Sequence, residues 1–344
     1  MPALRPSLAG VANFSPVRRP PLRIVIAAAF ALLLAVFAAA CGGGEEDEGS
    51  EEPVPAPSAS SFPAVDGDLD SLTSEIKPTD QYVVSPAAKV FSQGRNRFPF
   101  GVFTVDGEQV TDGQVAIYAA AGPTGKAEGP FPARIENLET EPAFTAQTTS
   151  QDPDAAKVVY VTDLVLDQPG EWRLVAAIED EDGQFVGTLL PSIDVKATDP
   201  VPAVGEPAPE IHTPTTDDVG DIQEIDTRVP PSSLHEADFA DVVGRKPVVL
   251  LFATPALCTS RVCGPVVDVA EQVKREVGDD AEFIYMEIYN DNDPARGARP
   301  QVRDFGLTSE PWLFVIDKNG RIDTRIEGAF SVAELQAAVD RVIG

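Results

Sequence analysis

Continuous apolar runs and helical spacing alternate in the C-terminal third of the chain. Residues 247–254 and 281–288 are mostly apolar, a pattern that predicts strands buried on both faces of a sheet. Between them, apolar residues over 265–277 recur every three or four positions, which predicts a helix with one buried face. The order strand, helix, strand predicts an α/β domain.

The same domain ends in a hairpin and a second helix. Residues 312–317 and 321–328 predict two strands, and the tripeptide at 318–320 between them is typical of a tight turn. Ser331 and Glu334 have the spacing of a capping box, which predicts the start of a final amphipathic helix. The full order is strand, helix, strand, long loop, strand, strand, helix.

From about residue 80 to 197 the pattern changes to short runs rich in Val, Ile, Phe and Tyr, separated by turn signals. Apolar residues at 172, 174, 176 and 178 share one parity, as expected for a strand with one face in a core. Several strands at this spacing predict an all-β sandwich. The hairpin DQPGEWRLVA resembles the late strands of bacterial immunoglobulin-like modules. We expect a binding or spacer module, because it holds no cluster of Met, His or paired acids.

The N-terminal pattern is that of a targeting segment. Arg18, Arg19 and Arg23 precede an unbroken apolar run over 24–40, which ends in small residues before Cys41. Such an order is typical of a secretory signal. The position of Cys41 resembles a bacterial lipobox, which implies a lipid anchor at this residue. The alternative is an uncleaved transmembrane anchor. Both predict that the remainder is extracytoplasmic and anchored to the bacterial cell membrane.

Two segments have the composition of linkers. Residues 41–79 begin with glycines and acids and continue with Pro, Ala and Ser, which cannot bury enough apolar surface to fold. Residues 198–218 are Pro-rich and acidic. The predicted organisation is a signal peptide at 1–40, a disordered tether at 41–79, a β-sandwich module at 80–197, a Pro-rich linker at 198–218 and the α/β domain at 219–344.

Charge and residue usage exclude several classes of function. The 344 residues include 26 Lys and Arg against 55 Asp and Glu, a formal net charge of −29. This balance excludes nucleic-acid binding, because contact with phosphates requires clustered basic residues. Two His and three Cys are too few for a closed zinc site built from those ligands. We therefore expect no metal and no cofactor.

Two cysteines lie where the first strand of the α/β domain turns into its helix. Cys258 precedes the helix, whose N-terminus would stabilise a thiolate and lower the pKa of that thiol. Cys263 leads the apolar stripe and is expected to face the core. A disulfide needs Cα atoms about 4.4–6.8 Å apart, and a regular helix over 258–263 would not allow this. The helix can instead begin at Gly264-Pro265, which leaves 258–263 as a loop.

The segment from about residue 204 to 344 resembles the thioredoxin superfamily, in particular its extracytoplasmic thioredoxin-like and peroxiredoxin-like branch. The motifs that carry this resemblance are VGEPAPEI, PVVLLFATPALC and FGLTSEPWLFVIDKNGRI. The resemblance implies a thioredoxin-like fold and a redox-active Cys258–Cys263 disulfide, with Cys258 as nucleophile and Cys263 as resolving cysteine. It also implies that Pro311 is a cis-proline beside the substrate groove, and that the partner is a thiol or disulfide protein or an electron donor.

The chain departs from that family at the centre of the motif. Four residues separate the cysteines where thioredoxins have two, and Leu251 stands where they have a buried acid. Three functions therefore stay open: a thiol–disulfide oxidoreductase, to which Arg261 could supply positive charge, a peroxiredoxin-like thiol peroxidase, and a non-enzymatic lipoprotein with a structural disulfide. Two weaker expectations are that Glu287 and the loop 290–304 are solvated, and that His235 lies in a surface turn or a short helix.

Overall fold

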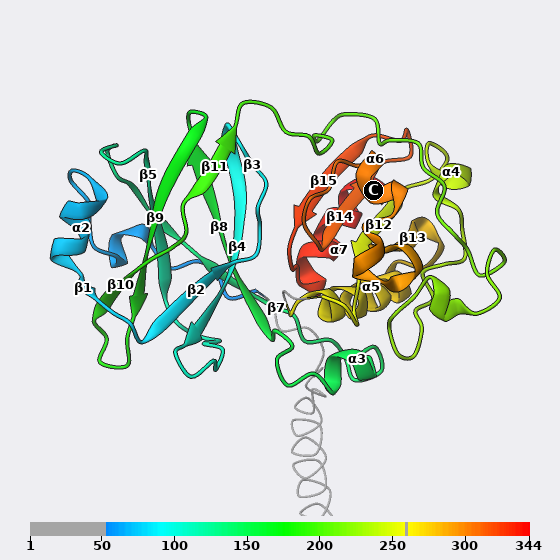
Figure 1. Ribbon diagram of the computed structural model, residues 1–344, viewed down its shortest axis with the longest axis horizontal. Helices are drawn as coiled ribbons and strands as arrows, with labels where there is room; N and C mark the ends of the chain where they lie inside the picture. The colour runs from blue at the N-terminus through cyan, green and yellow to red at the C-terminus, as the bar shows by residue number, and fades with distance from the viewer. Residues whose placement is uncertain (1–52, 259–260) are drawn as a thin grey trace, which may run out of the picture. The chain divides into compact units, whose positions relative to one another are not determined.

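The computed structural model describes residues 53–258 and 261–344, all of which belong to one compact unit (Figure 1). None of the helices in these ranges has the length and apolar character needed to cross a membrane. The predicted signal at 1–40 and the predicted lipid anchor at Cys41 lie outside the described residues.

The N-terminal part contains two β-sheets that share one apolar core (Figure 1). The first sheet has the order β2-β4-β8-β7. The second is centred on β9, which pairs with β5, β10 and β11. The strands and helices of this part are β1 Lys77–Pro78, β2 Tyr82–Pro86, β3 Phe91–Ser92, β4 Gly94–Thr104, β5 Val115–Ala121, β6 Glu128–Pro132, β7 Arg134–Asn137, β8 Val158–Leu166, β9 Gly170–Glu179, β10 Phe185–Leu189, β11 Ile193–Lys196, α2 Leu69–Glu75 and α3 Gln147–Ser150.

Alternation along the strands explains this arrangement. Phe98, Phe100 and Val102 of β4 enter the shared core, as do Trp172 and Leu174 of β9. The alternate residues of each strand therefore point to the opposite face of the sheet. The prediction of a two-sheet β module is confirmed.

The structured part begins before residue 80. Phe62, Leu69, Leu72 and Ile76 are buried and form an apolar cluster with residues of β5 and β9, including Tyr118. Asp68 caps α2 by accepting a hydrogen bond from the backbone N–H of Ser71 at 2.9 Å. The prediction of a disordered tether reaching residue 79 is therefore wrong for residues 62–76, because four apolar side chains widely spaced among Pro, Asp and Ser are enough to cover the second sheet.

The C-terminal part is an α/β domain with the predicted order of elements (Figure 1). Its sheet has the order β13-β12-β14-β15, with β12 and β13 parallel and the other pairs antiparallel. The strands and helices are α4 Phe239–Val242, β12 Val248–Ala253, α5 Cys263–Val277, β13 Glu282–Glu287, α6 Pro300–Asp304, β14 Trp312–Ile316, β15 Ile322–Glu327 and α7 Val332–Ile343. The 3-10 helices of the chain are η1 Ala59–Ser61, η2 Ile222–Glu224, η3 Gly278–Asp280, η4 Asn290–Asn292 and η5 Pro294–Arg296.

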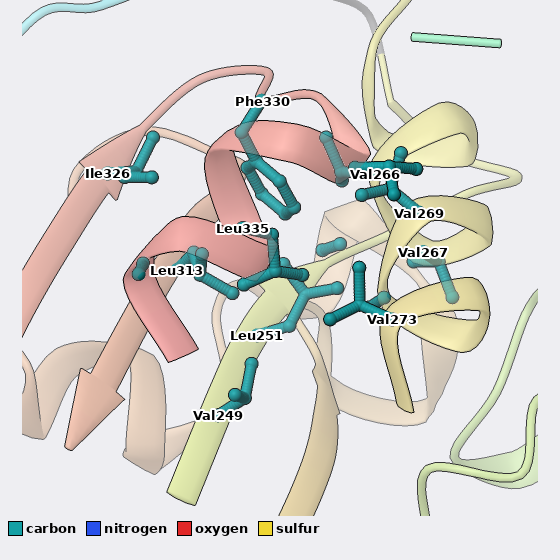
Figure 2. Close-up of a cluster of buried hydrophobic side chains, with 14 of the residues drawn as sticks. Val249, Leu251, Val266, Val267, Val269, Val273, Leu313, Ile326, Phe330 and Leu335 are labelled. Atoms are coloured by element: carbon teal, nitrogen blue, oxygen red, sulfur yellow. The ribbon is translucent and has the colours of Figure 1, made fainter. Parts of the chain in front are cut away.

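Both faces of this sheet are buried, which explains the continuous apolar runs. Val249 and Leu251 of β12 pack against α5 and α7, together with Leu313 of β14 (Figure 2). The intervening Leu250 and Phe252 enter a second cluster on the other face. Val201 and Ile211 belong to that second cluster. The segment predicted as a linker at 198–218 is thus partly built into the core of the α/β domain.

The β module contacts the α/β domain through the outer face of its first sheet. Val159 and Val161 of β8 belong to the same apolar cluster as α5 and α7. Beside them, Arg97 of β4 donates hydrogen bonds to the carboxylate of Glu334 at 2.7 and 2.9 Å. Ser331 accepts the backbone N–H of Glu334, as the predicted capping box requires. The Glu334 side chain, however, pairs with Arg97 and Arg134, so only one half of the predicted box forms.

Candidate active site

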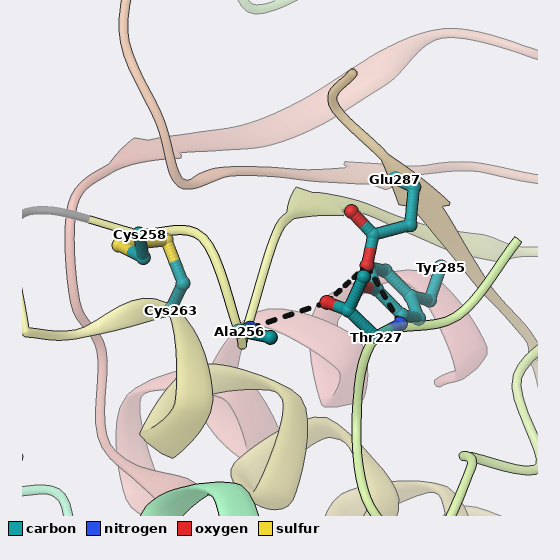
Figure 3. Close-up of a disulfide and its surroundings, with 6 residues drawn as sticks. All are labelled: Thr227, Ala256, Cys258, Cys263, Tyr285 and Glu287. Carbon is teal, nitrogen blue, oxygen red and sulfur yellow. Dashed lines mark hydrogen bonds between the residues drawn. A yellow bond between two sulfur atoms is a disulfide. The ribbon is translucent and has the colours of Figure 1, made fainter. Parts of the chain in front are cut away.

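The cysteine pair lies in the turn that joins β12 to α5. Cys258 and Cys263 form a disulfide with their Cα atoms 5.9 Å apart (Figure 3). Helix α5 begins at Cys263, with Val262 as its N-cap, so Cys258 lies outside the helix. The two cysteines therefore do not share one regular helix, in agreement with the expectation from their spacing.

The two sulfur-bearing residues differ in exposure. Cys263 has 0% of its surface exposed and packs in the cluster between the sheet and α5. Cys258 is half-buried at the edge of the same cluster. Of the two residues, Cys258 is therefore the one that is in contact with solvent.

Strand register brings Pro311 and Glu287 to the same end of the sheet as the cysteine loop. Ala253, the last residue of β12, pairs with Glu287 of β13. Phe252 pairs with Trp312, the first residue of β14, so Pro311 lies at this edge as well. The Glu310–Pro311 peptide bond is cis, as the resemblance implied.

A short hydrogen-bonded chain connects Glu287 to the cysteine loop (Figure 3). The Glu287 carboxylate accepts the backbone N–H of Thr227 at 2.8 Å and its hydroxyl at 2.5 Å. The same hydroxyl accepts the backbone N–H of Ala256, two residues before Cys258, at 3.2 Å. The Tyr285 hydroxyl also donates to this carboxylate. Thr227 therefore couples a buried acid to the backbone that leads to the reactive cysteine.

Glu287 is a buried acid, and the expectation of a solvated side chain is wrong. Only 1% of its surface is exposed, and burial raises the pKa of its carboxyl group although three hydrogen bonds from Thr227 and Tyr285 act in the opposite direction. The burial of Glu287 was not predicted from the sequence, because the expected position for a buried acid in the resembled family is occupied by Leu251. The available signal was an acid inside the otherwise apolar run at 281–288.

A second buried polar cluster, built around Arg228 and Asp268, connects α5 to the β module. The Arg228 guanidinium pairs with Asp268 of α5 at 2.8 Å and donates to the carbonyl of Phe144 at 2.6 Å. Asp268 also accepts the backbone N–H of Ala146 at 3.1 Å. The helix that carries Cys263 is thus tied to the loop between β7 and β8. Nothing in the sequence marked this pair, since the two residues lie forty positions apart.

His235 is buried, so its expected place in a surface turn is also wrong. Its Nε2 lies 3.2 Å from the carboxylate of Asp226, and its ring packs against Tyr285 with centroids 5.1 Å apart. Asp226 also accepts the Ser232 hydroxyl at 2.7 Å. These contacts make His235 part of the packing beneath β13.

The proline end of the site is held by a further acid. Glu327 of β15 accepts the backbone N–H groups of Lys89 and Val90 at 2.8 and 3.0 Å. The Ser309 hydroxyl donates to the same carboxylate. Burial raises the pKa of Glu327. The β module is therefore attached both near the cysteines and near Pro311.

Across residues 53–258 and 261–344, no group of three or more His, Cys, Asp or Glu side chains is arranged to hold a metal ion. Arg261 is paired rather than directed at the cysteines: its guanidinium lies 3.4 Å from Asp154 and 5.6 Å from the centroid of the Phe103 ring.

No protein-family model matches this chain, and no match was found among curated proteins. Two solved structures are similar to part of it. A thiol:disulfide interchange protein of the thioredoxin family from Chlorobium tepidum TLS is 21% identical, with a TM-score of 0.30, and the match covers 42% of this chain and 100% of that one. A structure described as a thiol:disulfide interchange protein DsbE from Chlorobium tepidum is 16% identical, with a TM-score of 0.30 and coverage of 41% and 99%.

Proposed function

We propose that the α/β domain is a thioredoxin-like thiol–disulfide oxidoreductase, with Cys258 as the attacking cysteine and Cys263 as the resolving cysteine. The observation that carries this proposal is the asymmetry of the disulfide. One residue is accessible at the edge of the core and its partner is fully buried at the start of α5. A pair of this kind can be opened from one side only, as a two-step exchange requires.

The exchange conserves atoms and electrons. In the reduced protein the Cys258 thiolate attacks one sulfur of a partner disulfide, and the partner's other sulfur leaves as a thiolate. The Cys263 thiolate then attacks the Cys258 sulfur, which re-forms the protein disulfide and releases the second partner thiolate. Two electrons pass from the protein to the partner. A dithiol partner drives the same steps in reverse.

The surroundings support exchange more than a purely structural bond. Closing a loop with a sequence separation of five stabilises a protein by only about 2 kcal/mol in the chain-entropy model. Such a short loop is therefore a weak staple. The hydrogen bonds through Thr227 also connect the buried acid Glu287 to the backbone of Ala256, two residues before Cys258, so the acid can influence the conformation of the segment that carries the attacking sulfur.

The test is a pair of matched serine variants together with a redox titration. Cys263→Ser should accumulate a mixed disulfide with a thiol–disulfide partner protein at Cys258, and Cys258→Ser should form none. The wild-type pair should have a reduction potential well above about −300 mV in a dithiol/disulfide buffer titration read by mass. A lower potential without trapping by Cys263→Ser would identify a structural disulfide. Peroxide-driven disulfide formation much faster than air oxidation would instead identify a peroxidase.

We also propose that this domain acts outside the cytoplasm, tethered through a lipid at Cys41, with an immunoglobulin-like module between tether and catalyst. The apolar run at 24–40 and the glycines and acids after Cys41 support this placement. Cys41→Ser should move the protein from the detergent phase to the aqueous phase in a partition assay. An unchanged partition would favour the uncleaved transmembrane anchor.

A further inference from the structure

We propose that the β module supplies the docking groove for the partner, and that this groove receives an extended, uncharged, apolar segment flanking the partner's reactive cysteine. The proposal rests on the proposed function, because it names what the Cys258 site recognises. It assigns to the first sheet of the β module a direct share in substrate choice.

The groove is a cavity of about 380 Å³ on the outer face of β2 and β4. Its walls include Val83, Phe103 and Val105 from the β module and Val262 from the loop before α5. Val83 and Val105 are 52% and 61% exposed, which is unusual for apolar side chains grouped around one hollow. Pockets of this size and lining are typical binding sites in proteins.

The groove continues an existing interface. On β8, Val159 and Val161 of the same outer face are covered by the α/β domain. Val159 also lines the groove, so the covered and uncovered parts of the face meet at this residue. The sheet therefore uses one half of its apolar outer face to hold the α/β domain and leaves the other half open beside the cysteines.

The far wall of the groove belongs to the cysteine loop. Arg261 and Val262 line it, and Arg261 follows Cys258 by three residues, which limits their Cα separation to about 11 Å. The Arg261 carbonyl accepts the backbone N–H of Ala156 at 2.9 Å, and its guanidinium lies over the Phe103 ring. A partner cysteine that reaches Cys258 thus places residues a few positions away inside the groove.

The lining selects the occupant. Its one charged side chain is Arg261, and that charge is balanced by Asp154 at 3.4 Å. A neutral, apolar hollow disfavours a charged segment, because burying an unpaired charge is costly. Phe103 contributes its ring edge, since the ring lies against Gly101, where a Cβ would come within 2.6 Å of it, and under the Arg261 guanidinium. The exposed Val83 and Val105 contribute the open apolar surface. An extended apolar peptide is therefore the occupant that fits.

The test compares two short synthetic peptides, each with a central cysteine blocked as a mixed disulfide with glutathione. One has valine and phenylalanine flanks and the other has serine and glycine flanks. The pre-reduced wild-type protein should react with the apolar peptide about tenfold faster. Phe103→Ser and Val83→Ser should bring the ratio of the two rates close to one. Leu189→Ser is the matched control, an exposed apolar residue on β10 of the other sheet, and should keep the wild-type ratio.

The outcomes separate this proposal from the proposed function. Equal rates for both peptides with the wild-type protein would overturn the groove and leave the oxidoreductase standing. If the protein exchanges with neither peptide nor oxidised glutathione, the proposed function fails. In that case the groove is tested separately, by calorimetric measurement of the binding of a cysteine-free apolar peptide to the oxidised protein. Binding to wild type that is lost in Val83→Ser supports the groove, and absence of binding to wild type overturns it. If Val83→Ser changes the sedimentation coefficient of the protein but not its rates with the two peptides, the groove on β2 and β4 forms contacts between copies of this chain. That outcome also overturns the proposal.

Discussion

The β module and the α/β domain treat polar groups in their interiors in opposite ways. The core between the two sheets of the β module consists of Val, Leu, Ile, Ala and aromatic residues. Its aromatic hydroxyl, Tyr160, points out of the core to the backbone N–H of Gly113 at 3.0 Å. The α/β domain instead buries Asp226, Arg228, Asp268 and Glu287, each with hydrogen-bond partners.

Under the proposed function, that difference distinguishes a scaffold from the domain that carries the chemistry. Buried charges cost free energy unless they are paired, and perturbed groups of this kind often gather at functional sites. In the α/β domain, buried charged groups contact the backbone before Cys258 and the helix that begins at Cys263. In the β module the buried carboxylate of Glu136 lies at the boundary with the α/β domain, where it accepts the Ser331 hydroxyl at 2.5 Å.

The largest effect is expected from breaking the buried ion pair between Arg228 and Asp268. Arg228→Ala leaves Asp268 charged and unpaired, and it removes the hydrogen bond to the Phe144 carbonyl. The free energy of unfolding should fall by about 3–5 kcal/mol in urea titrations. The control on the β module is Arg95→Ala, which breaks an exposed pair with Asp163 and should cost less than about 1 kcal/mol. Equal losses of unfolding free energy in the two variants would contradict the difference between the buried charges of the α/β domain and the exposed charges of the β module.

A smaller effect is expected at the link between the acid and the cysteine loop. Thr227→Val keeps the shape of the side chain but removes the hydroxyl that Glu287 and Ala256 share. Leaving the buried carboxylate with one donor fewer should cost about 1–3 kcal/mol. The pH dependence of the exchange rate at Cys258 should change as well. Thr227→Ser keeps a hydroxyl at this position and should show the wild-type pH dependence of the exchange rate. If it does not, the contribution of Thr227 comes from packing and not from its hydrogen bonds.

The smallest effect concerns the pH dependence of stability. Burial raises the pKa of Glu287 above its ordinary 4.5, so the folded protein holds this proton more tightly than the unfolded chain. Its stabilising contribution is present below pH 4.5 and is lost as the pH rises through the folded-state pKa. Glu287→Gln keeps an oxygen for the Thr227 and Tyr285 donors and removes this loss.

The measurement is the free energy of unfolding of both proteins from pH 4 to 8. The stability of Glu287→Gln relative to wild type should rise with pH above about 4.5 and stay level below it. A difference that does not vary with pH would show that the carboxyl group titrates alike in the folded and unfolded states.

Local pattern was sufficient for much of the α/β domain. The strands at 248–253 and 312–316 lie within the predicted runs, and α5 and α7 end where helical spacing ends. Their residues alternate between two apolar clusters, and this alternation produces a continuous apolar run that is readable without knowledge of the fold. The cysteine loop was predictable for the same local reason, since a regular helix cannot place two cysteines five positions apart at bonding distance.

The pattern of apolar and polar residues did not predict the contacts between segments that lie far apart in the sequence. Residues 62–76 contain too few apolar residues for their pattern to predict a folded segment. Their apolar side chains are buried against β5 and β9, which lie far away in the sequence. His235 and Glu287 read as surface residues because polarity alone cannot tell a solvated side chain from one whose hydrogen bonds are satisfied inside.

By itself, the sequence determined the two-part organisation, the order of elements in the α/β domain and the positions of Cys258, Cys263 and Pro311, because each depends on residue type and short spacing. Only the tertiary structure decided that Glu287 is buried and connected through Thr227 to the backbone before Cys258, that Arg228 and Asp268 tie α5 to the β module, and that a groove opens between the outer face of β2 and β4 and the residues Arg261 and Val262. The physical reason is burial: which polar groups lose water, and which partners replace it, is set by segments far apart in the chain.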